Sequence, residues 1–170
     1  MMTTQDTIKA LWSSGFVNRW HSHPDPRLRN AQDTTAAHSQ RVAILVDLLY
    51  TYQLGNVPRH LITTALYHDA AECATGDTPA GAKRSSEYLD EILDEVTVEW
   101  QMDHSMYCGM WDSIDNRWVK MCDLLDAILF VKHVAPDLLE REDWQKDIDK
   151  CTETAGELSV STIVKDLIHG

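Results

Sequence analysis

Several features that define whole classes of protein are missing from this sequence. No apolar run approaches the length of a membrane span, and residues 1–10 are polar, without the apolar segment of a signal peptide. No block of lysine and arginine occurs, and the formal net charge is -12, so the chain is poorly suited to gripping a nucleic acid backbone. We therefore expect a cytoplasmic protein that binds neither a membrane nor a nucleic acid polymer.

Disulfide and zinc-finger frameworks are also missing. The 4 cysteines form no C-x-x-C pair and fit no zinc-finger spacing, so we expect reduced thiols. No repeat, low-complexity stretch or linker divides the chain, and no segment alternates apolar and polar residues as a strand would. With 170 residues, of which 44% are hydrophobic, the chain is expected to form a single all-α domain over residues 1–170.

Apolar residues recur at helical spacing along most of the chain. Asp33 or Thr34 can cap the second helix and Gly55 closes it, Pro58 fits the first turn of the third, and Pro136 stops the fifth. The connection 18–33 is long for a structureless loop, and such loops tend to be functional. We predict a compact bundle of about six to seven helices. The expected helices cover residues 8–16, 34–55, 58–73, 85–105, 113–134, 141–155 and 159–168.

Four polar residues lie on helix faces that are otherwise built for a core. His68 and Asp69 are adjacent on the third predicted helix, His38 shares the core stripe of the second, and Asp123 lies among apolar residues of the fifth. Burying a charge without a partner is very costly, and a divalent transition ion bound by two imidazoles and two carboxylates would supply one. Such a set leaves coordination positions for water and substrate, as catalytic sites do.

Each of these residues also has a plain structural interpretation. His38 alone is more often a satisfied core histidine than a ligand, and Asp123 alone can pair with Lys120 or Arg117 on its own helix. The metal-site interpretation gains weight because rejecting it requires all of these separate structural interpretations to be true at once.

Four stretches carry a family resemblance. They are Thr35-Ala36-Ala37-His38-Ser39, Tyr67-His68-Asp69-Ala70-Ala71-Glu72, Thr75-Gly76-Asp77-Thr78-Pro79 and Val119-Lys120-Met121-Cys122-Asp123. In this order they resemble the HD-domain phosphohydrolases, and within them the YfbR-type 5'-deoxynucleotidases and the small phage dATP triphosphohydrolases called DatZ. The resemblance spans roughly residues 16 to 130. In one position the chain departs from the pattern, because Ala37 stands where many relatives carry Glu before the first histidine.

The resemblance implies a role for each matching residue. The divalent ion, with zinc, cobalt or manganese as the expected metals, would be bound by His38, His68, Asp69 and Asp123. Glu72 and Asp77 would orient or deprotonate the attacking water or assist the leaving oxygen. Arg19 would bind phosphate, and Trp20 would pack on the nucleoside and disfavour a 2'-hydroxyl. Further substrate contacts are expected from Ser22, Pro79, Lys83 and Lys120.

Two substrates fit such a site. Cleavage at the phosphorus nearest the nucleoside releases triphosphate from dATP or phosphate from a deoxynucleoside monophosphate. The stretch Arg19–Pro24, followed by Arg27 and Arg29, resembles the phage-type subgroup, so dATP hydrolysis in a host cytoplasm is the first expectation and a 5'-deoxynucleotidase the alternative. A non-catalytic nucleotide-binding helical module is an alternative of another class. A homo-oligomer is expected, because Trp100, Trp111, Trp118 and Trp144 offer more aromatic surface than one small core hides.

Overall fold

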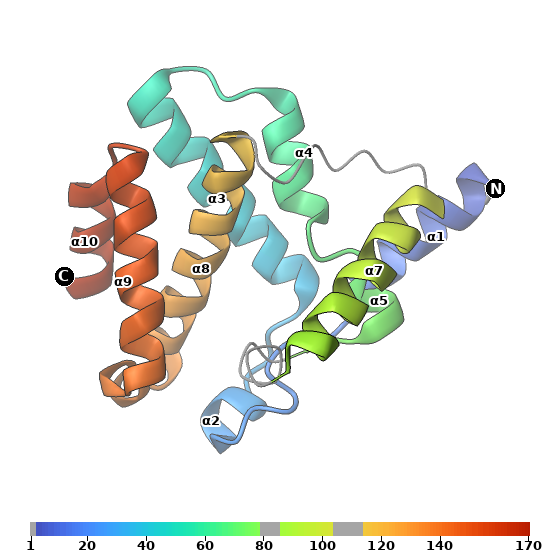
Figure 1. Cartoon of the computed structure of the whole chain (residues 1–170), viewed down its shortest axis with the longest axis horizontal. Helices are drawn as coiled ribbons and strands as arrows, with labels where there is room; N and C mark the ends of the chain where they lie inside the picture. Colours follow the sequence, from blue (N-terminus) through green and yellow to red (C-terminus); the bar gives the residue numbers. More distant parts are fainter. Residues whose placement is uncertain (1–2, 79–85, 104–113) are drawn as a thin grey trace. The chain divides into compact units, whose positions relative to one another are not determined.

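The computed structural model describes residues 3–78, 86–103 and 114–170, and all regular structure in these ranges is helical (Figure 1). This confirms the all-α prediction, and apart from the third, over residues 58–73, each expected helix has a counterpart. The α-helices are α1 (Thr4–Ser14), α2 (Pro26–Arg29), α3 (Thr35–Leu54), α4 (Arg59–Tyr67), α5 (Glu72–Thr75), α7 (Glu87–Asp103), α8 (Ile114–Val134), α9 (Glu142–Glu157) and α10 (Ser161–His169), with the 3-10 helix η1 (Pro136–Glu140). Within these ranges no helix has the length and apolar character needed to cross a membrane.

Local sequence signals explain most helix ends. Gly55 has a φ of 90°, which suits glycine and ends α3, and Pro136 opens η1 directly after α8. Of the two possible caps of α3, Thr34 takes the role, because its Oγ1 accepts a hydrogen bond of 3.3 Å from the Ala37 N–H. The Asp33 side chain is therefore available for other contacts.

The third predicted helix is interrupted at the motif that contains His68 and Asp69. α4 ends at Tyr67, and α5 begins only at Glu72. Between them the backbone makes tight turns, with hydrogen bonds from the Ala70 N–H to the Tyr67 carbonyl and from the Glu72 N–H to the Asp69 carbonyl, both 3.0 Å. The prediction of one continuous helix was wrong here, since no glycine or proline marks the break in the sequence.

The long connection 18–33 also differs from a structureless loop, because it contains the short helix α2. Asp25 precedes this helix and accepts a hydrogen bond of 2.8 Å from the Arg27 N–H, and Pro26 occupies its first turn. Leu28 of α2 is fully buried.

The chain forms two compact units. Unit 1 comprises Met1–His38 and Tyr67–Cys108, and unit 2 comprises Ser39–Leu66 and Gly109–Gly170. In unit 1, α5 contacts both α1 and α7. In unit 2, α8 packs against η1, α9 and α10, which form one group of helices (Figure 1). Whether the chain acts as the single domain expected from its sequence stays a prediction.

The core of unit 2 uses the tryptophans that the sequence offered as a reason for self-association. Trp118 of α8 and Trp144 of α9 are both buried, and the Trp118 ring lies 5.2 Å from that of Tyr50. These two side chains therefore need no second copy to cover them. Trp100 is half-buried, and Trp111 lies outside the described residues. Self-association stays a prediction, with less support than the sequence suggested.

A buried ion pair joins α3 to α8 within unit 2. Arg41 donates to both oxygens of Asp126, with Nε–Oδ1 at 2.7 Å and Nη2–Oδ2 at 3.0 Å, and its guanidinium lies 5.2 Å from the Phe130 ring centre. The Asp126 side chain is 4% exposed, whereas that of Arg41 is 35% exposed. This bidentate geometry sets the register of the two helices.

The unequal burial of this pair predicts unequal costs of breaking it. Arg41→Met leaves a carboxylate in the interior without its guanidinium, and we expect it to lower the free energy of unfolding by roughly 3 kcal/mol. Asp126→Asn leaves a guanidinium that still reaches water, and we expect a loss of about 1 kcal/mol. Urea unfolding followed by circular dichroism measures both, and equal losses would contradict this account.

Candidate functional site

Three ligand-type atoms meet within unit 1. His38 Nε2 lies 3.2 Å from His68 Nε2, and Asp69 Oδ2 lies 3.4 Å from the first nitrogen and 3.3 Å from the second. His38 comes from the first turn of α3, while His68 and Asp69 come from the tight turns between α4 and α5. The chain reversal there lets two adjacent side chains reach one point. His38 is fully buried, and the other two side chains are partly exposed.

The spacing of these atoms fits a metal ion. Two ligand atoms bound at tetrahedral angles to one zinc-like ion lie about 3.3–3.4 Å apart, which follows from metal–ligand distances of ~2.0–2.1 Å. The three observed separations are 3.2, 3.3 and 3.4 Å. Two imidazole nitrogens that face each other need a proton or a cation between them, because both otherwise present lone pairs. Within the described residues, this is the group of histidine and acidic side chains that could hold a metal ion.

Glu72, the first residue of α5, lies beside this triangle. Its Oε2 accepts a hydrogen bond of 3.0 Å from Thr35 Oγ1. Burial, together with the negative charges of Asp69 and Asp77, raises the pKa of Glu72 from its ordinary 4.5 to about 8, against the opposing effects of Thr35 and Arg19. A carboxyl group with a pKa near neutrality can exchange a proton with water at physiological pH, as general acid–base catalysis requires.

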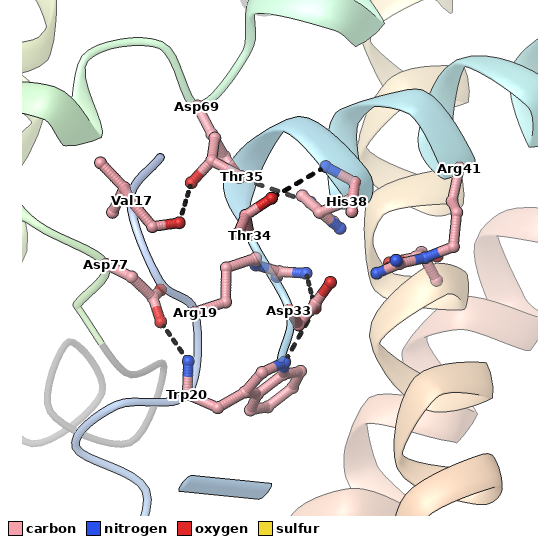
Figure 2. A network of polar contacts seen from close by, with 12 residues as sticks. Val17, Arg19, Trp20, Asp33, Thr34, Thr35, His38, Arg41, Asp69 and Asp77 are labelled. Carbon is pink, nitrogen blue, oxygen red and sulfur yellow. Dashed lines mark hydrogen bonds and ion pairs between the residues drawn. The ribbon is translucent and has the colours of Figure 1, made fainter. Parts of the chain in front are cut away.

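The segment before α2 places an arginine and a tryptophan in the same unit. Residues 17–19 run antiparallel to residues 33–35, with hydrogen bonds from the Arg19 N–H to the Asp33 carbonyl (3.0 Å) and from the Thr35 N–H to the Val17 carbonyl (2.9 Å). The Arg19 guanidinium lies 5.3 Å from the Trp20 ring centre. We call Arg19 and Trp20 the Arg–Trp arm (Figure 2).

Trp20 is held in an uncommon backbone conformation, with a φ of 64°. For a bulky residue this left-handed region costs about 1–3 kcal/mol and persists only where neighbouring contacts impose it. Two such contacts are present: the Trp20 N–H donates to Asp77 Oδ2 at 2.7 Å, and the indole Nε1–H donates to Asp33 Oδ2 at 3.1 Å. Figure 2 shows both bonds fixing the two ends of this residue. Strain of this kind is typical of functional sites.

Comparison with known proteins agrees with this geometry. The family described as 5'-deoxynucleotidase YfbR-like matches residues 11–130, which include the whole triangle, Glu72 and the Arg–Trp arm. The chain belongs to the YfbR-like 5'-deoxynucleotidase family.

One curated relative supports this membership over a shorter stretch. A 5'-deoxynucleotidase of Cronobacter sakazakii (strain ATCC BAA-894) is 35% identical to this YfbR-like chain over 74 residues, 40% of this chain and 35% of that protein. The chain therefore spans about a third of the length of the curated relative it matches. No solved structure matches the chain significantly.

The structure brings together most of the site residues expected from the sequence. Unit 1 contains Arg19, Trp20, His38, His68, Asp69, Glu72 and Asp77. Ser22 also belongs to unit 1 and is exposed. Asp123 and Lys120 lie on α8 in unit 2, with Asp123 half-buried and Lys120 exposed, so their part in the site stays a prediction. Pro79 and Lys83 lie outside the described residues.

Two residues of this network were missed by sequence analysis. Thr35 was noted only as part of a motif, yet its hydroxyl donates to Glu72 and its N–H pairs with Val17. Asp33 was considered only as a helix cap, yet its carboxylate is 1% exposed and accepts the Trp20 indole N–H. The available signal for Asp33 was weak: two capping residues in succession, of which a helix needs one.

The raised pKa of Glu72 predicts how pH changes the stability of the metal-free YfbR-like protein. The folded state holds this proton up to about pH 8, whereas the unfolded chain releases it near 4.5, so the folded state binds more protons between these values and loses stability as pH rises. Glu72→Gln removes this loss. In EDTA we expect it to stabilise the fold by roughly 2–4 kcal/mol relative to wild type above pH 8.

Below pH 4.5, where wild-type Glu72 is protonated in both states, the same variant should have nearly wild-type stability. Thermal unfolding at the two pH extremes measures the difference. A difference in stability between variant and wild type that stays the same at both pH extremes would contradict the raised pKa of Glu72.

Proposed function

We propose that this protein is a metal-dependent 5'-deoxynucleotidase that hydrolyses a deoxynucleoside 5'-monophosphate to a deoxynucleoside and phosphate. The observation that carries the proposal is the triangle of His38, His68 and Asp69, with its atoms 3.2–3.4 Å apart. Membership of the YfbR-like family supports the reaction class. A deoxynucleotide is therefore the proposed partner, as a small-molecule substrate.

Asp123 is the proposed fourth protein ligand. It lies on α8, three residues before Asp126, and His38 lies on α3, three residues before Arg41. The proposal for Asp123 rests on the family resemblance, in which Val119-Lys120-Met121-Cys122-Asp123 is the last of the four motifs. The expected metals are zinc, cobalt and manganese, which all accept mixed nitrogen and oxygen ligands.

The phosphate of the substrate would bind the Arg19 guanidinium. Arg19 offers a planar fork to phosphate oxygens, and its side chain is only 11% exposed, so its charge is weakly screened. Trp20 would pack on the nucleoside, and Ser22 and Pro79 would contribute further contacts. One phosphate needs few cations, which suits a chain with a formal net charge of -12.

Hydrolysis then needs one proton removed from water and one delivered to the leaving oxygen. A bound divalent ion supplies Lewis-acid activation of the phosphate ester and of the attacking water. Glu72, in its ionised form, accepts the proton from the water as its oxygen bonds to phosphorus. The bond between phosphorus and the 5'-oxygen breaks, and the 5'-oxygen takes up a proton, which Glu72 can return. Asp77 supports the site by holding the Trp20 backbone N–H, alongside its proposed role toward the water. General acid–base assistance of this kind contributes about 10²–10⁴-fold.

The first expectation, cleavage of dATP to triphosphate, loses ground to this proposal. The family match and the curated relative both carry the name of a 5'-deoxynucleotidase, and neither indicates a triphosphate substrate or a phage source. We therefore propose the monophosphate as substrate.

Removing a metal ligand should abolish hydrolysis while leaving the fold intact. For His68→Ala and Asp69→Asn we expect phosphate release from dAMP to fall roughly 10³-fold or more, because the ion contributes several kcal/mol of charge stabilisation. Metal content of the purified protein should fall in parallel. Matched controls are His60→Ala and Asp115→Asn, which break a surface pair on α4 and α8 with a separation of 2.9 Å and should leave both values unchanged. Wild-type turnover in either ligand variant would refute the site.

A substrate panel separates the proposed nucleotidase from the triphosphohydrolase and from a non-catalytic module. We expect dAMP or another deoxynucleoside monophosphate to be hydrolysed at least about tenfold faster than dATP, a preference of ~1.4 kcal/mol. Lys83→Ala and Lys120→Ala should slow neither reaction selectively. A selective loss of dATP hydrolysis in these variants would restore the triphosphohydrolase. Tight nucleotide binding by a protein that contains no metal and releases no product would support the non-catalytic nucleotide-binding module.

A further inference from the structure

Among the acidic residues of unit 1 whose side chains the structure describes, Asp33 is almost fully buried and contacts both members of the Arg–Trp arm. Its carboxylate is 1% exposed. Oδ2 accepts the indole Nε1–H of Trp20 at 3.1 Å and lies 3.6 Å from Nη1 of Arg19. The Asp33 backbone carbonyl also accepts the Arg19 N–H at 3.0 Å. One acidic residue thus contacts the arm through its main chain and through its side chain, and Figure 2 shows the side-chain contacts.

Helix capping does not explain why this carboxylate is buried. Thr34 caps α3 through its hydroxyl, so this helix end already has a side-chain cap. A buried carboxylate carries a large desolvation cost, and donors aimed at it offset that cost. Here the arm supplies one hydrogen-bond donor, the Trp20 indole N–H, and one cation, the Arg19 guanidinium at 3.6 Å. The burial is therefore understandable as a means of holding Arg19 and Trp20 in one geometry.

The Trp20 backbone strengthens this argument. Its φ of 64° is unfavourable for a bulky residue, and a side chain free to rotate would do nothing to keep it there. Asp77 anchors the backbone end of Trp20, and Asp33 anchors the indole end. The Arg19 guanidinium lies over the indole ring and beside the Asp33 carboxylate. Removing Asp33 would release the ring and the guanidinium together.

We propose that Asp33 is a positioning residue, which holds the Arg19 guanidinium and the Trp20 ring in the orientation that receives a nucleoside monophosphate. It acts through the arm and touches neither the substrate nor the reacting atoms. This inference rests on the proposed function, because the arm's ligand is the proposed substrate. Asp33 is thus expected to affect substrate binding and to leave metal binding unchanged.

Two variants separate the contacts that Asp33 makes. Asp33→Asn keeps an oxygen that can accept the indole N–H but loses the negative charge beside Arg19. Asp33→Ala loses both. We expect the KM for dAMP to rise roughly 10- to 100-fold in Asp33→Asn, the effect of losing an interaction with a charged group, and further in Asp33→Ala. The turnover number and the metal content should stay within about twofold of wild type, since the triangle and Glu72 are untouched.

The indole N–H signal of Trp20 in a nitrogen–proton NMR spectrum reports the arm directly. Trp20→Phe assigns this signal, because it removes one of the 6 tryptophans. Asp33→Ala should move the signal, and Asp33→Asn should move it less. Asp25→Asn is the matched control: Asp25 belongs to the same connection and pairs with Arg27, so its loss should change neither the signal nor the KM.

The dissociation constant of dAMP, measured by calorimetry on the metal-loaded protein, makes the result independent of turnover. Weaker binding in Asp33→Asn with unchanged metal content supports the proposal, whether or not wild type hydrolyses dAMP. Binding without hydrolysis in wild type would overturn the proposed function alone. Unchanged binding and KM in both Asp33 variants, or parallel losses of binding, turnover and metal, would overturn the positioning role. A wild-type protein that neither binds nor hydrolyses dAMP would overturn both proposals.

Discussion

Two imidazole nitrogens and a carboxylate oxygen approach one another to 3.2–3.4 Å in unit 1, and this approach is favourable only if a cation or proton lies among them. The local chain path follows from this constraint. His38 is fully buried in the first turn of α3, and the backbone turns tightly between α4 and α5 to bring His68 and Asp69 to the same point. Glu72 starts the next helix and retains a proton near neutrality, because its surroundings are buried and already negative.

A second layer of polar contacts surrounds that centre and is made mostly by residues that take no part in metal binding. Thr35 holds Glu72, Asp77 holds the Trp20 backbone, and Asp33 holds the Trp20 ring beside Arg19. Each of these contacts joins segments that are separated in sequence, so the geometry of the Arg–Trp arm depends on how the residue before α3 and the segment after α5 come together. Polar networks of this kind specify one arrangement when their groups are satisfied.

Unit 2 is organised differently. Its helices α8, α9 and α10 bury apolar faces, including Trp118 and Trp144, and its main buried polar feature among the described residues is the Arg41–Asp126 pair. That pair fixes the register of α3 against α8.

The sequence by itself determined the helical class, the main helices and the residue types of the candidate site. Helical periodicity, glycine and proline at helix ends, and acidic or imidazole groups on apolar faces are local signals, and they identified His38, His68 and Asp69, whereas the family resemblance identified Glu72. The tertiary structure alone decided what those signals left open. The break after Tyr67 has no local marker, the choice of Thr34 over Asp33 as cap depends on what else Asp33 contacts, and the tryptophans turned out to be core residues in unit 2. Hydrogen bonds and ion pairs between distant segments settle such questions, because a sequence pattern shows which groups need partners but not which partners the fold brings within reach.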